Sequence, residues 1–343
     1  MSSKCLSFQA REMPAFAGYP GCWGPIPDIL PPHLQHRSHH RVHRFTWPLR
    51  FVIVGGLFLF ALVHGVRRRD RSPGGTAAAA VRGPRPLALD DADRDGLPDT
   101  LEAALAARFA PAVILDPQEA NRPASIAWLL SRIGGLGHLG SDRGSFPPEV
   151  RAGSADPQDW VTYVHVYPRT DGRINVQYWF FYTYNEGPLF FDHDSDWEHI
   201  TVEVEPNGVP RGVYFAQHGN NNPGVYRPWS EVRKVGDKTG ATIGEHPLVL
   251  SARGTHASYA DQASLAWFEH ASGCAAADRC TDQLWRTWLG GGLVNIGERA
   301  APLGAPEALA YGGRWGSPGR FLRSRSAPPG PLHQHGFSSD GFD

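Results

Sequence analysis

Residues 193–199 hold two imidazoles, three carboxylates and one tryptophan within seven positions. From Trp197 onward apolar and polar residues alternate, and this period of two predicts a half-buried strand. Glu198 heads the apolar face of that strand, Asp196 projects to the same side, and His193 lies in the preceding turn. Burying a bare carboxylate costs on the order of several kcal/mol, so this convergence predicts a divalent cation with nitrogen and oxygen ligands. The alternative is a rim of solvated charges at the end of a strand.

A second acidic stretch, residues 91–102, matches the pattern D-x-D-x-D-G-x5-E of an EF-hand-type calcium loop. Gly96 permits the sharp turn, and residues 99–109 are expected to continue as a helix. Residues 84–89 before the loop are not helical, so the loop resembles the one-helix calcium loops of thrombospondin type 3 and dockerin repeats. We expect Ca²⁺ in a structural role that pins the preceding linker to the domain. The expected ligands are Asp91, Asp93, Asp95, the Leu97 carbonyl, Asp99 (directly or through water) and a bidentate Glu102.

Several histidines end or flank predicted strands, and one of them beside an open metal position would suit a base that activates water. The candidates are His199, His218 and His256. Each alone is more often a hydrogen-bonded structural histidine, and no G-x-S-x-G motif of a serine hydrolase occurs. A metal-dependent hydrolase is therefore an alternative to a binding module, with a purely structural or interaction domain as the third hypothesis.

The composition favours short strands joined by turns, because 39 glycines and 30 prolines accompany 11 tryptophans and 17 phenylalanines. We expect a mainly β fold, an antiparallel β-sandwich with a few short peripheral helices. A net charge of −1 gives no reason to expect nucleic acid as a partner. The expected strands cover 161–167, 173–184, 197–205, 212–218 and 248–252, the helices 99–109, 124–132 and 282–289, and a long loop 219–246.

The N-terminal part has a different character from the rest of the chain. The segment 46–66 is just long enough to span a bilayer as an anchor, and the short uncharged run within it equally fits a cleaved signal peptide. Basic residues flank both of its ends. We expect the rest to be extracytoplasmic, anchored or secreted. The expected organisation is a disordered basic and histidine-rich segment 1–45, the anchor or signal 46–66, a flexible linker 67–90, the calcium loop 91–102, the β-sandwich 103–322 and a disordered tail 323–343.

Cys274 and Cys280 bracket a small loop that has no further cysteine or histidine at zinc spacing. In an exported domain they would most simply form a disulfide. Two buried thiols are the alternative for a cytosolic domain.

Between about residues 105 and 320, several sequence motifs occur in the same order as in the vacuolar protein sorting-associated protein 62 family, which this part of the chain resembles. The opening "APv…P-x-E" and "P-S-S-v-x-W-f-l" segments of that family correspond to residues 108–119 and 122–130. The name of the family says little about chemistry. The other segments that carry the resemblance are 177–185, 196–199, 213–219, 246–259 and 313–316.

The central motif also resembles the G-H-R-H-D-W-E heptapeptide of the necrosis-inducing cytolysins, which holds a divalent cation at the membrane-facing end of a β-sandwich. Its first histidine, aspartate and glutamate fall on His193, Asp196 and Glu198, and a further aspartate falls on Asn185. The glycine and second histidine are absent here. The resemblance implies that Mg²⁺ or Ca²⁺ bound at these four residues engages polar lipid headgroups or glycans.

Overall fold

The computed structural model describes most of the chain after the linker. The predicted anchor 46–66 and the cysteines 274 and 280 lie outside this part, so the anchor and the disulfide stay predictions. No helix in the part that is described is long and apolar enough to cross a membrane. The described residues are 90–140, 145–187, 191–218, 224–235, 245–266, 269–272, 283–317 and 327–342.

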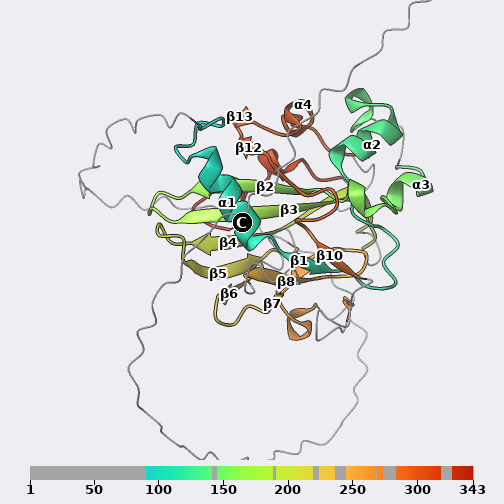
Figure 1. Cartoon of the computed structure of the whole chain (residues 1–343). Helices are drawn as coiled ribbons and strands as arrows, with labels where there is room; N and C mark the ends of the chain where they lie inside the picture. The colour runs from blue at the N-terminus through green and yellow to red at the C-terminus, as the bar shows by residue number, and fades with distance from the viewer. Residues whose placement is uncertain are drawn as a thin grey trace, which may run out of the picture. The chain divides into compact units, whose positions relative to one another are not determined.

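A six-stranded sheet forms the centre of the fold (Figure 1). Its two longest strands, β3 and β4, pair over nearly their whole length, with Ile174 opposite Val204 and Asn185 opposite His193. Alternating apolar residues place one face of each strand in the core. In spatial order the strands are β11 (Leu293–Asn295), β2 (Thr162–Pro168), β3 (Ile174–Asn185), β4 (His193–Val204), β5 (Pro210–Phe215) and β6 (Val225–Pro228).

A smaller sheet packs against the first. Strand β1 pairs in parallel with β8, and β11 pairs in parallel with β2 in the larger sheet, so the sheets are mixed rather than wholly antiparallel. The expected loop 219–246 also contains the short strands β6 and β7. The strands of the smaller sheet are β10 (Leu284–Arg286), β1 (Ala112–Ile114), β8 (His246–Ser251) and β7 (Lys234–Val235), with β9 (Ser258–Tyr259) paired to β8.

The main core lies between the two sheets. Val113 and Trp285 from the smaller sheet pack in one cluster with Tyr178 and Phe215 from the larger one. Helix α1 (Asp99–Phe109) adds Phe109 to this cluster, and its bounds agree with the prediction. The mainly β sandwich expected from the composition is thus confirmed.

The outer face of the six-stranded sheet buries a second cluster. Helix α2 (Ile126–Ile133) packs its apolar side there; Ser125 caps it by accepting a hydrogen bond from the Trp128 amide. The short helices α3 (Pro148–Arg151) and α4 (Pro306–Leu309) contribute Val150 and Leu309. Strands β12 (Gly297–Glu298) and β13 (Ala301–Pro302) form a small hairpin beside β2.

Two predictions about the C-terminal part are wrong. The segment 282–289 was expected to be helical, but β10 forms there because Trp285 fills the core opposite Val113. The tail 323–343 was expected to be disordered, yet its described residues 327–342 pack on the outer face of the larger sheet. The composition of the tail, poor in aliphatic residues, concealed the two phenylalanines that anchor it.

Polar and aromatic side chains of the sheet hold this C-terminal segment. The ring of Phe337 stacks on His165, with ring centroids 3.8 Å apart. Gln177 donates a hydrogen bond from Nε2 to the Gly336 carbonyl at 2.9 Å. Asn175 likewise donates to the Ser339 carbonyl at 3.2 Å. The outer face therefore binds the backbone of this segment through side-chain amides as well as burying its rings.

Candidate functional site

The loop 91–102 folds around its own backbone amides. Asp91 accepts hydrogen bonds from the amides of Asp95 and Gly96 at 3.2 and 3.1 Å, and Asp95 accepts one from the Leu97 amide at 2.6 Å. Gly96 has φ of +92°, a backbone conformation that glycine adopts without strain. Leu97 inserts into the core between the sheets and ties the loop to the fold.

Carboxylate oxygens that lack hydrogen-bond partners gather inside this loop. The side chains of Asp93 and Glu102 are only 3% and 1% exposed. Within the described residues, both oxygens of Asp93, one of Asp95 and one of Glu102 are buried without a hydrogen bond. Buried polar atoms almost always have a partner, so each exception needs an explanation. A cation bound among these oxygens provides one.

The spacing of the carboxylates suits an ion of the size of calcium. One oxygen each from Asp91, Asp93 and Asp95 lie within 4.8 Å of one another. Oxygens on opposite sides of a calcium ion are about 4.6–5.2 Å apart, since each Ca–O distance is about 2.3–2.6 Å. Among the histidine, cysteine and carboxylate side chains that the structure describes, no other group of three or more comes this close.

The electrostatics of the loop point the same way. Burial above all, with a smaller contribution from neighbouring carboxylates, raises the pKa of Glu102 to about 9, of Asp95 to about 7 and of Asp93 to about 6. The fold therefore resists ionising these groups together when no cation neutralises them. This is the pattern expected for ligands that gather in a loop to hold a metal ion.

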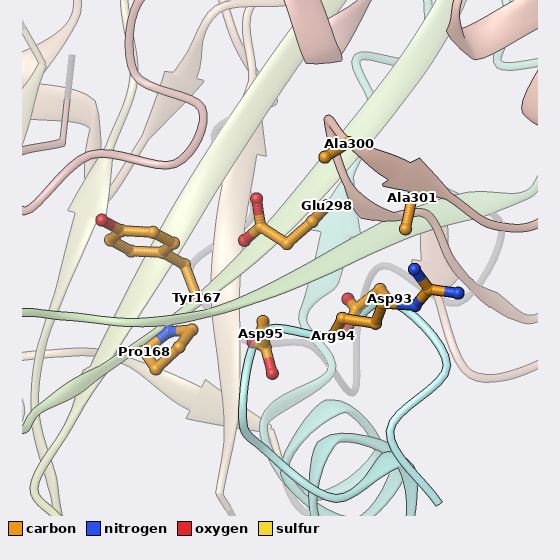
Figure 2. A pocket seen from close by; sticks show the side chains of 8 residues that line it. All are labelled: Asp93, Arg94, Asp95, Tyr167, Pro168, Glu298, Ala300 and Ala301. Atoms are coloured by element: carbon orange, nitrogen blue, oxygen red, sulfur yellow. The ribbon is translucent and has the colours of Figure 1, made fainter. Parts of the chain in front are cut away.

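Other parts of the chain complete the surroundings of the loop. Asn295, at the end of β11, donates a hydrogen bond from Nδ2 to Glu102 at 3.0 Å and so orients that carboxylate. The sequence offered no signal for this residue, because it lies far along the chain. Asp99 accepts a hydrogen bond from the Ala92 amide at 3.0 Å, which favours contact with an ion through water rather than directly. A cavity opens beside the loop, with Asp93 and Asp95 on one side and Glu298 on the other (Figure 2).

A second cluster of charged residues lies near the start of β4, around Asp196. His256 Nδ1 donates a hydrogen bond to Asp196 at 2.9 Å, and its Nε2 lies 3.6 Å from a carboxylate oxygen of Glu119. The ring of Tyr182 stacks on the imidazole, with centroids 3.8 Å apart. Despite burial, which lowers it, the two carboxylates raise the pKa of His256 to about 9. The imidazole thus stays protonated at neutral pH and neutralises Asp196 and Glu119 in part.

The four residues predicted to form the central cation site are close in the sheet, and three of them, Asn185, His193 and Asp196, are engaged separately. Asn185 donates a hydrogen bond to the Phe191 carbonyl at 2.8 Å, and His193 Nδ1 donates one to the Ser195 carbonyl at 2.8 Å. Asp196 is paired with His256. His193, Asp196 and Glu198 do not come as close together as the three aspartates of the loop. The structure does not assemble them around one point, and a divalent cation there stays a prediction.

The three candidate bases are also placed. His256 is fully buried and holds its proton, so it does not fit the role of a general base. His199 is buried, and its ring stacks on Trp179 with centroids 4.3 Å apart. His218 lies 2.9 Å from the buried carboxylate of Glu269 and is partly exposed. These contacts describe structural histidines.

Fold and loop together define a β-sandwich with an EF-hand-type loop at the rim of its larger sheet. The expected likeness to the vacuolar protein sorting-associated protein 62 family is confirmed. The chain is 29% identical to vacuolar protein sorting-associated protein 62 of Saccharomyces cerevisiae over 197 residues, which is 52% of this chain and 41% of that protein. It is 32% identical to the yeast vacuolar protein sorting-associated protein TDA6 over 108 residues, 28% of this chain and 23% of that protein.

The chain thus spans less than half the length of these curated relatives. No family model matches the sequence. Similar solved structures include NLPPya in complex with glucosamine, at 16% identity and a TM-score of 0.35 over 67% of this chain and 84% of that one. Necrosis and ethylene inducing protein 2 from the causal agent of witches' broom disease of cocoa matches at 22% identity and a TM-score of 0.29, over 46% and 66%. Such distant likenesses carry no argument about the site.

Proposed function

We propose that this chain is a calcium-binding β-sandwich module that engages polar ligands. The observation that carries the proposal is the set of buried carboxylate oxygens in the loop 91–102 that have no hydrogen-bond partner. Leaving such groups without a cation would destabilise the fold by on the order of several kcal/mol. A bound calcium ion instead makes the loop a rigid rim for the six-stranded sheet, to which Asn295 connects it.

The ligand set favours calcium over the other common divalent ions. All donors in the loop are oxygens, from carboxylates and one backbone carbonyl, which suits hard cations rather than zinc or copper. Calcium accepts six to eight oxygens in a flexible arrangement, whereas magnesium requires a near-octahedral set and keeps its waters. Loops of this type in extracellular modules bind calcium weakly, with dissociation constants of about 10⁻⁴–10⁻³ M.

The proposed ligands are glycans or polar lipid headgroups, and the proposed setting is extracytoplasmic, with tethering through residues 46–66. NLPPya has been solved with glucosamine and with mannosamine, which is a property of that protein. The route by which this chain would engage such ligands is a divalent cation. Hydrolysis is not part of the proposal, because Asp196 and Glu119 beside the buried His256 raise its pKa and favour its protonated form, which does not suit a general base.

Calorimetric titration of calcium chloride into the full chain tests the calcium site. The unmutated protein should bind one ion through the loop, and Asp93→Asn and Glu102→Gln should each weaken binding by about tenfold or more, because each removes a charged ligand. Glu307→Gln, which changes an exposed glutamate of α4, is the matched control and should leave the titration unchanged. Absence of calcium binding to the unmutated chain would overturn the proposal.

A further inference from the structure

The cavity beside the calcium loop has the size of a small-molecule site. Its volume is about 410 Å³, within the range of about 300–1,000 Å³ typical of such sites. It lies between the loop, the end of β2 and the β12–β13 hairpin, and Figure 2 shows side chains from all three facing it. The residues that line it are Asp93, Arg94, Asp95, Tyr167, Pro168, Glu298, Ala300 and Ala301.

One side of the cavity is the calcium loop itself. Asp93 and Asp95 both line the cavity and both carry buried oxygens without a hydrogen-bond partner, and Asp93 is only 3% exposed. A calcium ion held by these carboxylates therefore borders the cavity. Calcium accepts about six to eight oxygens, and the expected ligands other than Asp99 would supply about six: one each from Asp91, Asp93, Asp95 and the Leu97 carbonyl, and two from Glu102. Up to about two positions are thus left to water or to oxygens of a ligand.

The opposite side presents groups that bind hydroxyls and apolar C–H surfaces. The carboxylate of Glu298 is fixed by hydrogen bonds from His165 at 2.9 Å and Ser338 at 2.8 Å, which leaves further lone pairs available as acceptors. Tyr167 is half-buried and provides a flat aromatic surface next to Pro168. A preorganised acceptor beside an aromatic ring suits a molecule that has both hydroxyl groups and an apolar face.

The charge of the site decides between a neutral and an anionic ligand. When ionised, the acidic groups in and next to the cavity exceed the charge of one calcium ion and of Arg94 by two negative charges. This excess repels phosphate and carboxylate ligands but not neutral polyols. The acidic groups counted are Asp91, Asp93, Asp95, Glu102 and Glu298.

We propose that this cavity binds a sugar, two neighbouring hydroxyls of which complete the coordination of the calcium ion while Tyr167 packs against the sugar ring. The inference rests on the calcium site proposed above and locates ligand binding at the loop rather than at Asp196. Glu298 accepts a further hydroxyl hydrogen bond, and the excess negative charge makes an amino sugar bind at least as well as its neutral counterpart.

The test is titration of mannose, glucosamine and inorganic phosphate into the full chain in excess calcium, and again after calcium is removed by a chelator. Mannose and glucosamine should bind only with calcium present, and phosphate should not bind. Tyr167→Ala should weaken sugar binding by about tenfold, because the stacking surface is lost, whereas Tyr167→Phe should retain it. Calcium affinity should be the same in both variants. Tyr184→Ala, which changes a partly buried tyrosine at the far end of β3, is the matched control.

Two results separate this inference from the proposed function. Calcium binding without any response to the sugars would overturn the sugar site and leave the calcium module intact. Failure to bind calcium would overturn both. Phosphate binding in place of sugar, or sugar binding that is insensitive to calcium and to Tyr167→Ala, would equally overturn the inference.

Discussion

Two buried acidic clusters, one at each end of the larger sheet, solve the same electrostatic problem differently. In the cluster around Asp196, a protonated histidine from another part of the chain lies between two carboxylates and supplies the positive charge. In the loop, oxygens of Asp91, Asp93 and Asp95 come together, and the hydrogen bonds that the protein supplies come from backbone amides and, for Glu102, from the Asn295 amide. The first cluster is complete within the fold, whereas in our proposal a calcium ion completes the second.

The difference appears in the pKa values. His256 has a raised pKa and Glu119 a lowered one, so each stabilises the charged form of the other. In the loop, the pKa values of Asp93, Asp95 and Glu102 are all raised, because burial outweighs the hydrogen bonds that favour the charged forms. The opposite directions of the shifts reflect whether the fold itself supplies a countercharge beside the buried carboxylates.

Removal of the histidine should have the largest effect on stability. His256→Ala leaves Asp196 and Glu119 buried without their shared partner, and we expect a loss of about 3–5 kcal/mol in the free energy of unfolding. The loss should be the same with and without calcium, as measured by urea denaturation. His333→Ala, at an exposed histidine, should change stability by less than about 0.5 kcal/mol. A calcium-dependent loss in His256→Ala would show that the two clusters are not independent.

The pH dependence of stability should also separate the clusters. The pKa of His256 is about 9 in the fold and 6.5 in the unfolded chain, so its stabilisation is complete below pH 6.5 and is lost as the pH rises through about 9. The expected loss is about 3 kcal/mol. Measurement in saturating calcium isolates this contribution, because calcium keeps the loop carboxylates ionised.

Without calcium, the loop carboxylates should also lower the free energy of unfolding as the pH rises. Their raised pKa values also favour the protonated forms in the fold, so that stability falls as the pH rises from about 4.5 through about 9. His256→Gln should flatten the profile measured in calcium. An unchanged profile in that variant would contradict the assignment of the titration to His256.

The effect of Glu102→Gln on stability should have opposite signs with and without calcium. Without calcium the fold keeps Glu102 protonated, at a cost in stability at neutral pH, and Glu102→Gln removes that cost, so the free energy of unfolding should rise by about 1–2 kcal/mol. With excess calcium the same variant should be less stable than the unmutated chain, because the stabilisation by bound ion is reduced. Thermal melts with calcium and with chelator measure both signs. Destabilisation of Glu102→Gln under both conditions would indicate a merely structural carboxylate.

The smallest effect concerns the central cation predicted at Asn185, His193, Asp196 and Glu198. In a chain whose loop is disabled by Asp93→Asn and Glu102→Gln, Mg²⁺ and Mn²⁺ should stabilise by less than about 0.5 kcal/mol at pH 7, because His256 already occupies Asp196. A larger stabilisation that disappears in Glu198→Gln would establish the central metal site after all.

Local patterns in the sequence predicted local structure well. The alternation of Ile174, Val176 and Tyr178 indicated β3, and the contiguous ligands of residues 91–102 indicated both the loop and the start of α1. The three-residue strands β1 and β10 carry too few residues to show a period, so the segment 282–289 was predicted as a helix. Such strands are decided by partners far along the chain.

The candidate site was predictable only in part, for the same reason. His256 lies 60 residues from Asp196, and Asn295 lies 193 residues from Glu102. No spacing rule reaches that far, because these contacts depend on how the two sheets pack. The resemblance to the cytolysin motif drew attention to His193, yet the packing brings His256 to Asp196 instead.

The C-terminal segment on the outer face of the larger sheet has a consequence for folding during translation. Asn175 and Ser339, which pair in the fold, are 164 residues apart. At the usual 5–20 residues per second, the ribosome needs roughly 10–30 s to make the second partner after the first. For that time the nascent sheet presents His165, Gln177 and Trp179 without their cover. Until the C-terminal segment is made, the aromatic side chains on this face of the sheet remain uncovered and accessible to chaperones.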